Sequence, residues 1–123
     1  MALMNTWRPI TIDALESLVE AELRSCSDEL RGVFAKYRVP FRHGTLNRYG
    51  RLDLVFIVAQ RGSEVMYYED VEEGFNFSPL DAEGKILEHW CNQDELRHAL
   101  IRWLSPPGMD TRPRMGPAVP LTK

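Results

Sequence analysis

Four residues in the last third of the chain have side chains that can bind a metal ion: His89, Cys91, Asp94 and His98. Neutral imidazole and thiolate are good zinc ligands. Asp94 and His98 are four residues apart, so on a helix they would share one face. The spacing of the whole set matches no established zinc pattern. We therefore interpret them as a surface Asp–His pair and a small buried thiol, and we expect neither a metal nor another cofactor.

A cysteine nucleophile is a second chemistry that the residue types allow. Cys26 or Cys91 would need a neighbouring base, such as His43, His89 or His98, to make its thiolate available. The sequence does not bring any such pair together, and Cys26 falls on the apolar stripe of a predicted helix. The chain also has no Gly-rich phosphate loop, no G-x-S-x-G motif and no HExxH motif. We therefore predict that the protein is not an enzyme.

The densest group of carboxylates lies at residues 69–73, which read Glu-Asp-Val-Glu-Glu. Such a group could provide acid–base catalysis or hold a divalent cation. Acid–base catalysis usually requires a shielded carboxylate, and we expect water to reach all four. A solvated turn without function is one interpretation, and an interface is another, because aromatic residues rimmed by charge are typical of interfaces. The predicted partner-binding residues are Tyr67, Tyr68, Glu69, Asp70, Glu72 and Glu73.

Charge is divided unevenly along the chain, although its net charge is only −3. Residues 31–61 carry seven cations and one anion, whereas residues 64–95 carry ten anions and one cation. Concentrated like charge weakens a compact fold but speeds the encounter with a partner of opposite sign. The basic stretch with its aromatic residues could bind single-stranded nucleic acid, or it could pair internally with the acidic strands, which we favour.

The elements that position these residues begin with a helix. Thr11 is a good N-cap, and Ile10 and Leu15 have the spacing of a hydrophobic staple. Apolar residues then recur at steps of three and four as far as Tyr37, with a break or kink predicted around Cys26 because serines flank it. Pro40 ends the run. The apolar stripe comprises Leu15, Leu18, Val19, Leu23, Cys26, Leu30, Val33, Phe34 and Tyr37.

Residues 41–90 are predicted to form a meander of four or five strands. The central strand, Leu52–Ala59, is almost entirely apolar, which is typical of a strand covered on both faces. Its side chains should alternate, with Leu54, Phe56 and Val58 on one face and Val55 and Ile57 on the other. Short connections make neighbouring strands antiparallel. The other predicted strands are 41–47, 64–70, 74–80 and 85–90.

A second helix is predicted after Asn92, which with Glu95 has the spacing of a capping box; Cys91 and Leu96 occupy the staple positions. Its buried face would comprise Leu96, Ala99, Leu100, Trp103 and Leu104. We expect residues 1–104 to form a single domain and residues 105–123 to form a proline-rich tail.

These elements predict an α+β fold: an antiparallel meander of four to five strands with an N-terminal and a C-terminal helix packed on one face, a two-layer sandwich. If the other face of the central strand is also apolar, the tail or a second copy of the protein should cover it, so a homodimer is one expectation. The start of the chain lacks the pattern of a signal peptide, and no apolar run is long enough to cross a bilayer. We expect a cytoplasmic protein that does not act in a membrane.

The acidic stretch and its surroundings resemble the small α+β immunity proteins of bacterial toxin systems. The resemblance lies in residues 57–59, 65–76, 84–86 and 92–96 and covers about residues 10–104. It implies a non-enzymatic module that neutralises a cognate toxin through its acidic surface, with Glu69, Asp70, Glu72 and Glu73 as contacts. The acidic chaperones of bacterial secretion systems are similar in size and character. That alternative predicts a third helix around residues 78–87.

Overall fold

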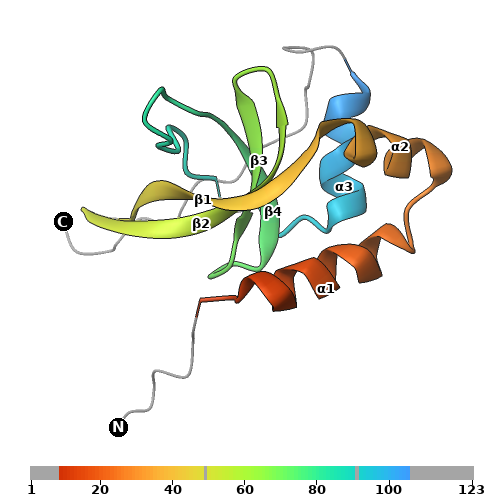
Figure 1. Ribbon diagram of the computed structural model, residues 1–123, viewed down its shortest axis with the longest axis horizontal. Helices are drawn as coiled ribbons and strands as arrows, with labels where there is room; N and C mark the ends of the chain where they lie inside the picture. Colours follow the sequence, from red (N-terminus) through yellow and green to blue (C-terminus); the bar gives the residue numbers. More distant parts are fainter. Residues whose placement is uncertain (1–8, 49, 91, 106–123) are drawn as a thin grey trace, which may run out of the picture.

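The computed structural model describes residues 9–48, 50–90 and 92–105, which form an α+β structure. Its strands make one antiparallel sheet in the order β1-β2-β3-β4, as the predicted meander requires. Figure 1 shows the three α-helices on one side of β3 and β4. None of these helices is both long enough and apolar enough to span a lipid bilayer. The elements are α1 (Ile12–Leu23), α2 (Asp28–Tyr37), β1 (Arg38–Arg48), β2 (Arg51–Arg61), β3 (Glu64–Glu69), β4 (Gly74–Pro79), α3 (Leu96–Ile101) and the 3-10 helix η2 (Arg102–Leu104).

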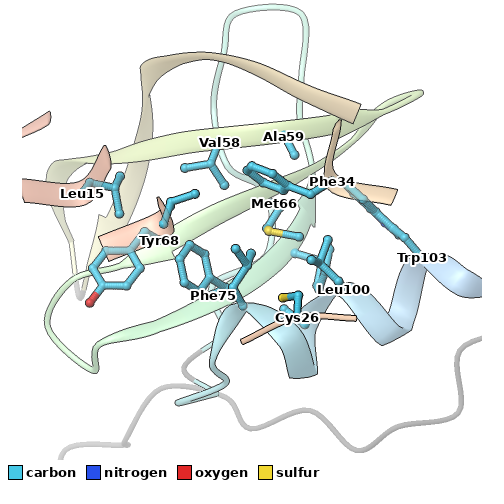
Figure 2. Close-up of a cluster of buried hydrophobic side chains, with 14 residues drawn as sticks. Leu15, Cys26, Phe34, Val58, Ala59, Met66, Tyr68, Phe75, Leu100 and Trp103 are labelled. Atoms are coloured by element: carbon cyan, nitrogen blue, oxygen red, sulfur yellow. The ribbon is translucent and has the colours of Figure 1, made fainter. Parts of the chain in front are cut away.

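The predicted N-terminal helix is two helices, and the break lies where the sequence indicated it. The hydroxyl of Thr11 accepts a hydrogen bond from the N–H of Ala14, which caps α1. The hydroxyl of Ser27 accepts from the N–H of Leu30 and starts α2 in the same way. Every residue of the predicted apolar stripe belongs to the core on the helix side of the sheet or packs against it. Figure 2 shows that core, in which Phe34 and Cys26 meet the sheet residues Met66 and Phe75.

The capping box predicted for the last helix is wrong. The helix begins at Leu96 with Glu95 as its N-cap, and the side chain of Glu95 makes no cap hydrogen bond. Glu22 at the end of α1 accepts the hydrogen bond of the Leu96 N–H instead, at 2.6 Å. Asn92 is occupied elsewhere, because its backbone exchanges hydrogen bonds with the side chain of Asn76.

Four of the five residues predicted for the buried face of this helix are buried, but Leu104 is 43% exposed. Cys91, and therefore the staple predicted for it, lies outside the described residues, and so does the tail from residue 106 onward.

The opposite face of the sheet has its own apolar core, and residues 80–90 cover it. Ile86 from that segment packs with Leu46 of β1, Val55 and Ile57 of β2, and Val65 and Tyr67 of β3. In Figure 1 the segment lies across the sheet from the helices. The chain itself thus covers the face for which the sequence suggested the tail or a second copy.

The fifth strand predicted at residues 85–90 does not form. The segment makes only isolated bridges, between Thr45 and Lys85 and between Leu80 and Ile86. Pairing stops just after the bridge between Leu80 and Ile86. The N–H of Leu87 still donates to the carbonyl of Pro79 at 3.2 Å, and the hydroxyl of Ser78 accepts hydrogen bonds from the N–H groups of Leu87 and Glu88 at 3.0 and 2.8 Å. At Glu88 a side chain therefore satisfies a backbone donor that a strand partner would otherwise bind.

The predicted alternation of the central strand is confirmed for four residues. Val58 and Phe56 belong to the helix-side core, whereas Val55 and Ile57 belong to the opposite core. Leu54 differs, since 54% of its surface is exposed. The reason is the length of the β1/β2 hairpin: β3 pairs with β2 only as far as Phe56, so residues 51–55 project beyond it.

Candidate binding site

Four of the six predicted partner-binding residues are buried. Tyr67 and Glu69 are at most 1% exposed, and Tyr68 and Asp70 are 7% and 9% exposed. Glu72 is half-buried and Glu73 is exposed. The expectation that water reaches all four carboxylates is therefore wrong for Glu69 and Asp70.

Arg48, at the end of β1, is the cation that allows these carboxylates to be buried. Its guanidinium contacts Glu69 at 2.5 Å and Asp70 at 3.3 Å, and its other terminal nitrogen contacts Asp53 at 3.2 Å. The side chain of Arg48 is itself only 10% exposed. Buried charges require such pairing, because removing an unpaired charge from water is very costly. We call Arg48, Asp53, Glu69, Asp70 and His89 the Arg48 cluster.

His89 links this cluster to the segment that covers the sheet. Its Nε2 lies 2.6 Å from Oε2 of Glu69, while the N–H of Val71 donates to Oε1 at 3.0 Å. Burial opposes the ionisation of Glu69, but the hydrogen bonds from His89 and Val71 and the charge of Arg48 outweigh it, so the pKa of Glu69 is lowered. Glu69 is therefore an ionised structural group, which does not suit the role of a general acid.

Tyr67 and Tyr68 are also buried in contacts that stabilise the fold. The hydroxyl of Tyr67 accepts a hydrogen bond from the N–H of Trp90 at 2.8 Å, on the covered face of the sheet. Tyr68 belongs to the helix-side core. Its ring packs at a tilt against the ring of Phe75, and the two ring centroids are 5.0 Å apart. Burial, reinforced by Glu73 and other nearby carboxylates, raises the pKa of Tyr68 to about 12.

A pocket of about 430 Å³ lies beside the Arg48 cluster, where the β1/β2 hairpin projects past the end of β3. Leu52 and Leu54, which are 64% and 54% exposed, line it. His43 lies opposite Phe56 in the ladder, and their rings are 4.3 Å apart. We call this the hairpin pocket; its lining residues are Pro9, Ile10, His43, Arg48, Leu52, Asp53, Leu54, Phe56 and Asp70.

Within the described residues, which do not include Cys91, the structure does not assemble the other chemistry that the sequence allowed. Among the described residues, no three histidine, cysteine, aspartate or glutamate side chains form a group that could hold a metal ion. Cys26 is buried, and its thiol donates to the carbonyl of Glu22 at 3.5 Å. Burial is the main cause that raises the pKa of Cys26, which disfavours the reactive thiolate.

The basic stretch is partly neutralised within the chain, as we favoured from the sequence. Arg48 pairs with strand carboxylates, and Arg38 pairs with Glu20 of α1 at 3.1 Å. Arg42 donates to the side chain of Gln60 at 2.8 Å. The two ion pairs leave fewer cations available to a nucleic acid, whereas the contact of Arg42 with a neutral amide cancels no charge.

Sequence reasoning missed the central role of Arg48 and the hairpin pocket. One signal was present: Arg48 follows Leu46 by two residues, so a strand would carry both on one face, the buried one. A charge predicted on a buried face requires a partner, and the carboxylates of the same sheet were the candidates. Comparison with models of known protein families, with curated proteins and with solved structures found no match.

Proposed function

We propose that this chain is a non-enzymatic protein-binding module that neutralises a cognate bacterial toxin in the cytoplasm. The observation that supports binding is the hairpin pocket, where two leucines more than half exposed adjoin carboxylates on a projecting hairpin. Exposed apolar side chains rimmed by charge are typical of protein interfaces. The choice of a toxin as the partner comes from the resemblance of the sequence to immunity proteins.

The interface that we propose differs from the one that the sequence indicated. Its centre moves from the acidic turn to Leu52, Leu54 and Asp53. Glu69 and Asp70 are buried in the Arg48 cluster, whereas the side chain of Asp53 is 23% exposed. Glu72 and Glu73 remain on the acidic turn that follows Asp70, and Asp70 lines the pocket. These two carboxylates therefore stay in the proposal as contacts at the rim.

The secretion-chaperone alternative does not gain support. It required a helix around residues 78–87, and that segment forms the end of β4, two bridges and a turn. We therefore carry forward only the immunity-like function.

Growth rescue tests the proposed function. The product of the adjacent open reading frame is expressed in a bacterial host, alone or together with this chain. We expect it to slow growth when alone, and we expect co-expression of this chain to restore growth and to give a complex that survives gel filtration. Leu54→Asp should abolish both effects, because it places a charge in the apolar centre of the interface.

Leu87→Asp is the matched control, since Leu87 is also 54% exposed but does not line the hairpin pocket. It should rescue growth as well as the unaltered chain does. A neighbouring product that neither slows growth nor binds the chain would contradict the proposed function.

A further inference from the structure

The backbone of the projecting hairpin has an open edge. Thr45 of β1 uses its N–H and carbonyl to bind Gly84 and Ile86 on its outer side. Its partner across the ladder, Leu54, is therefore in a non-hydrogen-bonded pair with β1. By the alternation of an antiparallel ladder, the N–H and carbonyl groups of Leu52 and Leu54 point away from β1, toward the side that β3 would occupy.

On that side, β2 has no strand partner within the described residues beyond Phe56. The pairing of β3 with β2 ends at Phe56 and Tyr68, and the chain then enters the turn at residues 70–73. Leu52 and Leu54, on either side of Asp53, thus have backbone donors and acceptors along this edge of β2 that are unpaired within the described residues. Both also have exposed apolar side chains. This combination suits an extended peptide. A peptide that adds to a sheet edge as a strand binds the free backbone N–H and carbonyl groups, and its alternate side chains contact the neighbouring side chains.

A carboxylate at this edge of β2 can accept a cationic group of the partner. Arg48 and Arg51 share the carboxylate of Asp53, and Arg48 also contacts Glu69 and Asp70. Both arginines contact Oδ2 of Asp53, whereas Oδ1 accepts no hydrogen bond from the described residues. Asp53 is 23% exposed, so an ammonium or guanidinium group can reach that oxygen.

Arg48 has one polar atom that its carboxylate partners do not satisfy. Its side chain is nine-tenths buried and lines the hairpin pocket, yet its Nε has no hydrogen-bond partner among the described residues. A buried donor without an acceptor costs free energy. This Nε is buried with the rest of the side chain, so the group that a cation of an incoming segment can reach at this edge is Asp53.

We infer that an extended segment of the partner protein adds to β2 at Leu52–Leu54 and places a lysine or arginine side chain on Asp53. This inference rests on the proposed function and specifies the chemistry of the partner. The segment would continue the sheet where β3 ends, and its apolar side chains would cover Leu52 and Leu54. A second copy of the chain and an acidic peptide are the competing occupants.

A peptide selection tests the inference on the full chain. Random twelve-residue peptides displayed on phage are selected against the purified protein, and the best binders are synthesised. We expect binders with a lysine or arginine within an apolar stretch. Replacing that residue with norleucine should weaken binding about tenfold or more, since a charge-assisted hydrogen bond is lost.

Backbone pairing has its own readout in the same peptides. Methylating one peptide nitrogen at a time should weaken binding at alternate positions and leave the positions between them unaffected, because only every second N–H faces β2. Leu54→Asp should abolish binding, whereas Leu87→Asp should not change it.

Several results would overturn the inference. They are a failure to select binders, selection of acidic peptides, an equal effect of methylation at every position, and a concentration-dependent dimer that Leu54→Asp dissolves. The proposed function can survive each of them if growth rescue succeeds, so the two failures are distinguishable. Conversely, binding of basic peptides without rescue would support the site and contradict the toxin as its partner.

Discussion

Arg48 shows how one cation can turn carboxylates that the sequence suggests are exposed into buried, paired groups. Its guanidinium has terminal nitrogens within 3.3 Å of three carboxylates that come from β2, the end of β3 and the residue after it. Burial opposes the charge of Arg48, but Glu69 and Asp70 outweigh it and raise the pKa of the guanidinium. The three carboxylates therefore form ion pairs within the chain, and their first role is to stabilise the fold.

Glu69 should make the stability of the protein depend on acid pH. The pKa values of Glu69 and Glu64 are lowered in the folded state from their ordinary value of 4.5, because hydrogen bonds to the carboxylates outweigh burial. The unfolded chain then takes up protons first as the pH falls. The free energy of unfolding should therefore decrease as the pH falls below about 4.5. Urea denaturation at a series of pH values measures it.

Glu69→Gln should lower the free energy of unfolding at pH 7 by about 1–4 kcal/mol, since it leaves Arg48 with a weaker partner in a buried place. It should also flatten the acid limb of the pH profile. Glu72→Gln, three residues away and half-buried, should change stability by less than about 0.5 kcal/mol. Equal effects of the two substitutions would contradict the structural role of Glu69.

At the scale of elements, two parts of the connection between β4 and α3 pack against the sheet. Residues 80–90 cover one face of the sheet, and residues 92–94 lie against the start of β4, where the N–H of Phe75 donates to the carbonyl of Asp94 at 3.0 Å. Gly74 makes this close approach possible. A β-carbon at Gly74 would lie 2.1 Å from the carbonyl oxygen of Asn92 and 2.6 Å from the Cα of Gln93.

Two glycine-to-alanine substitutions should therefore have opposite effects. Gly74→Ala should destabilise the protein by about 2 kcal/mol or more, because backbone atoms must move to accommodate the methyl group. Gly32→Ala should stabilise it by about 0.5–1 kcal/mol, since Gly32 lies within α2 and a β-carbon there would meet nothing within 4 Å. The shift of the urea midpoint measures both, and a tolerated alanine at residue 74 would contradict the close packing.

At the scale of the whole molecule, the division of charge along the sequence is partly cancelled by folding. The chain places Arg48 against acidic residues 21 and 22 positions away, and it places Arg102 against Glu64 at 2.6 Å. The surface therefore presents less concentrated charge than the sequence does. The recognition that we propose at the hairpin pocket would therefore depend on a few local groups rather than on one broad acidic face.

Most of the fold could be predicted because it follows from local patterns. The period of the apolar residues located α1 and α2, the serines around Cys26 located the break, and short connections fixed the antiparallel order of the strands. The failures involve long-range hydrogen bonds. Glu22 caps a helix 74 residues away, and the hydroxyl of Ser78 binds the N–H of Glu88 ten residues away. No local pattern records such contacts.

The candidate site was less predictable for the same reason. The sequence indicated the carboxylates of residues 69–73, but their burial depends on Arg48, which lies on a strand that is not adjacent to β3. The pocket depends on how far β1 and β2 extend beyond β3, and that is set by the different lengths of the strands. The spacing of residues along the chain reveals neither the pairing of Arg48 with these carboxylates nor the extension of the hairpin beyond β3.

The projecting hairpin also determines how its backbone hydrogens exchange with solvent deuterium. The N–H groups of Asp53 and Val55 face β1 and are held in its ladder, whereas those of Leu52 and Leu54 face outward. Neighbouring amides in the free protein should therefore exchange slowly and quickly in turn, because hydrogen bonding protects only every second one. This alternation in a single short stretch of β2 would mark, before any partner is known, the length of backbone that is available to one.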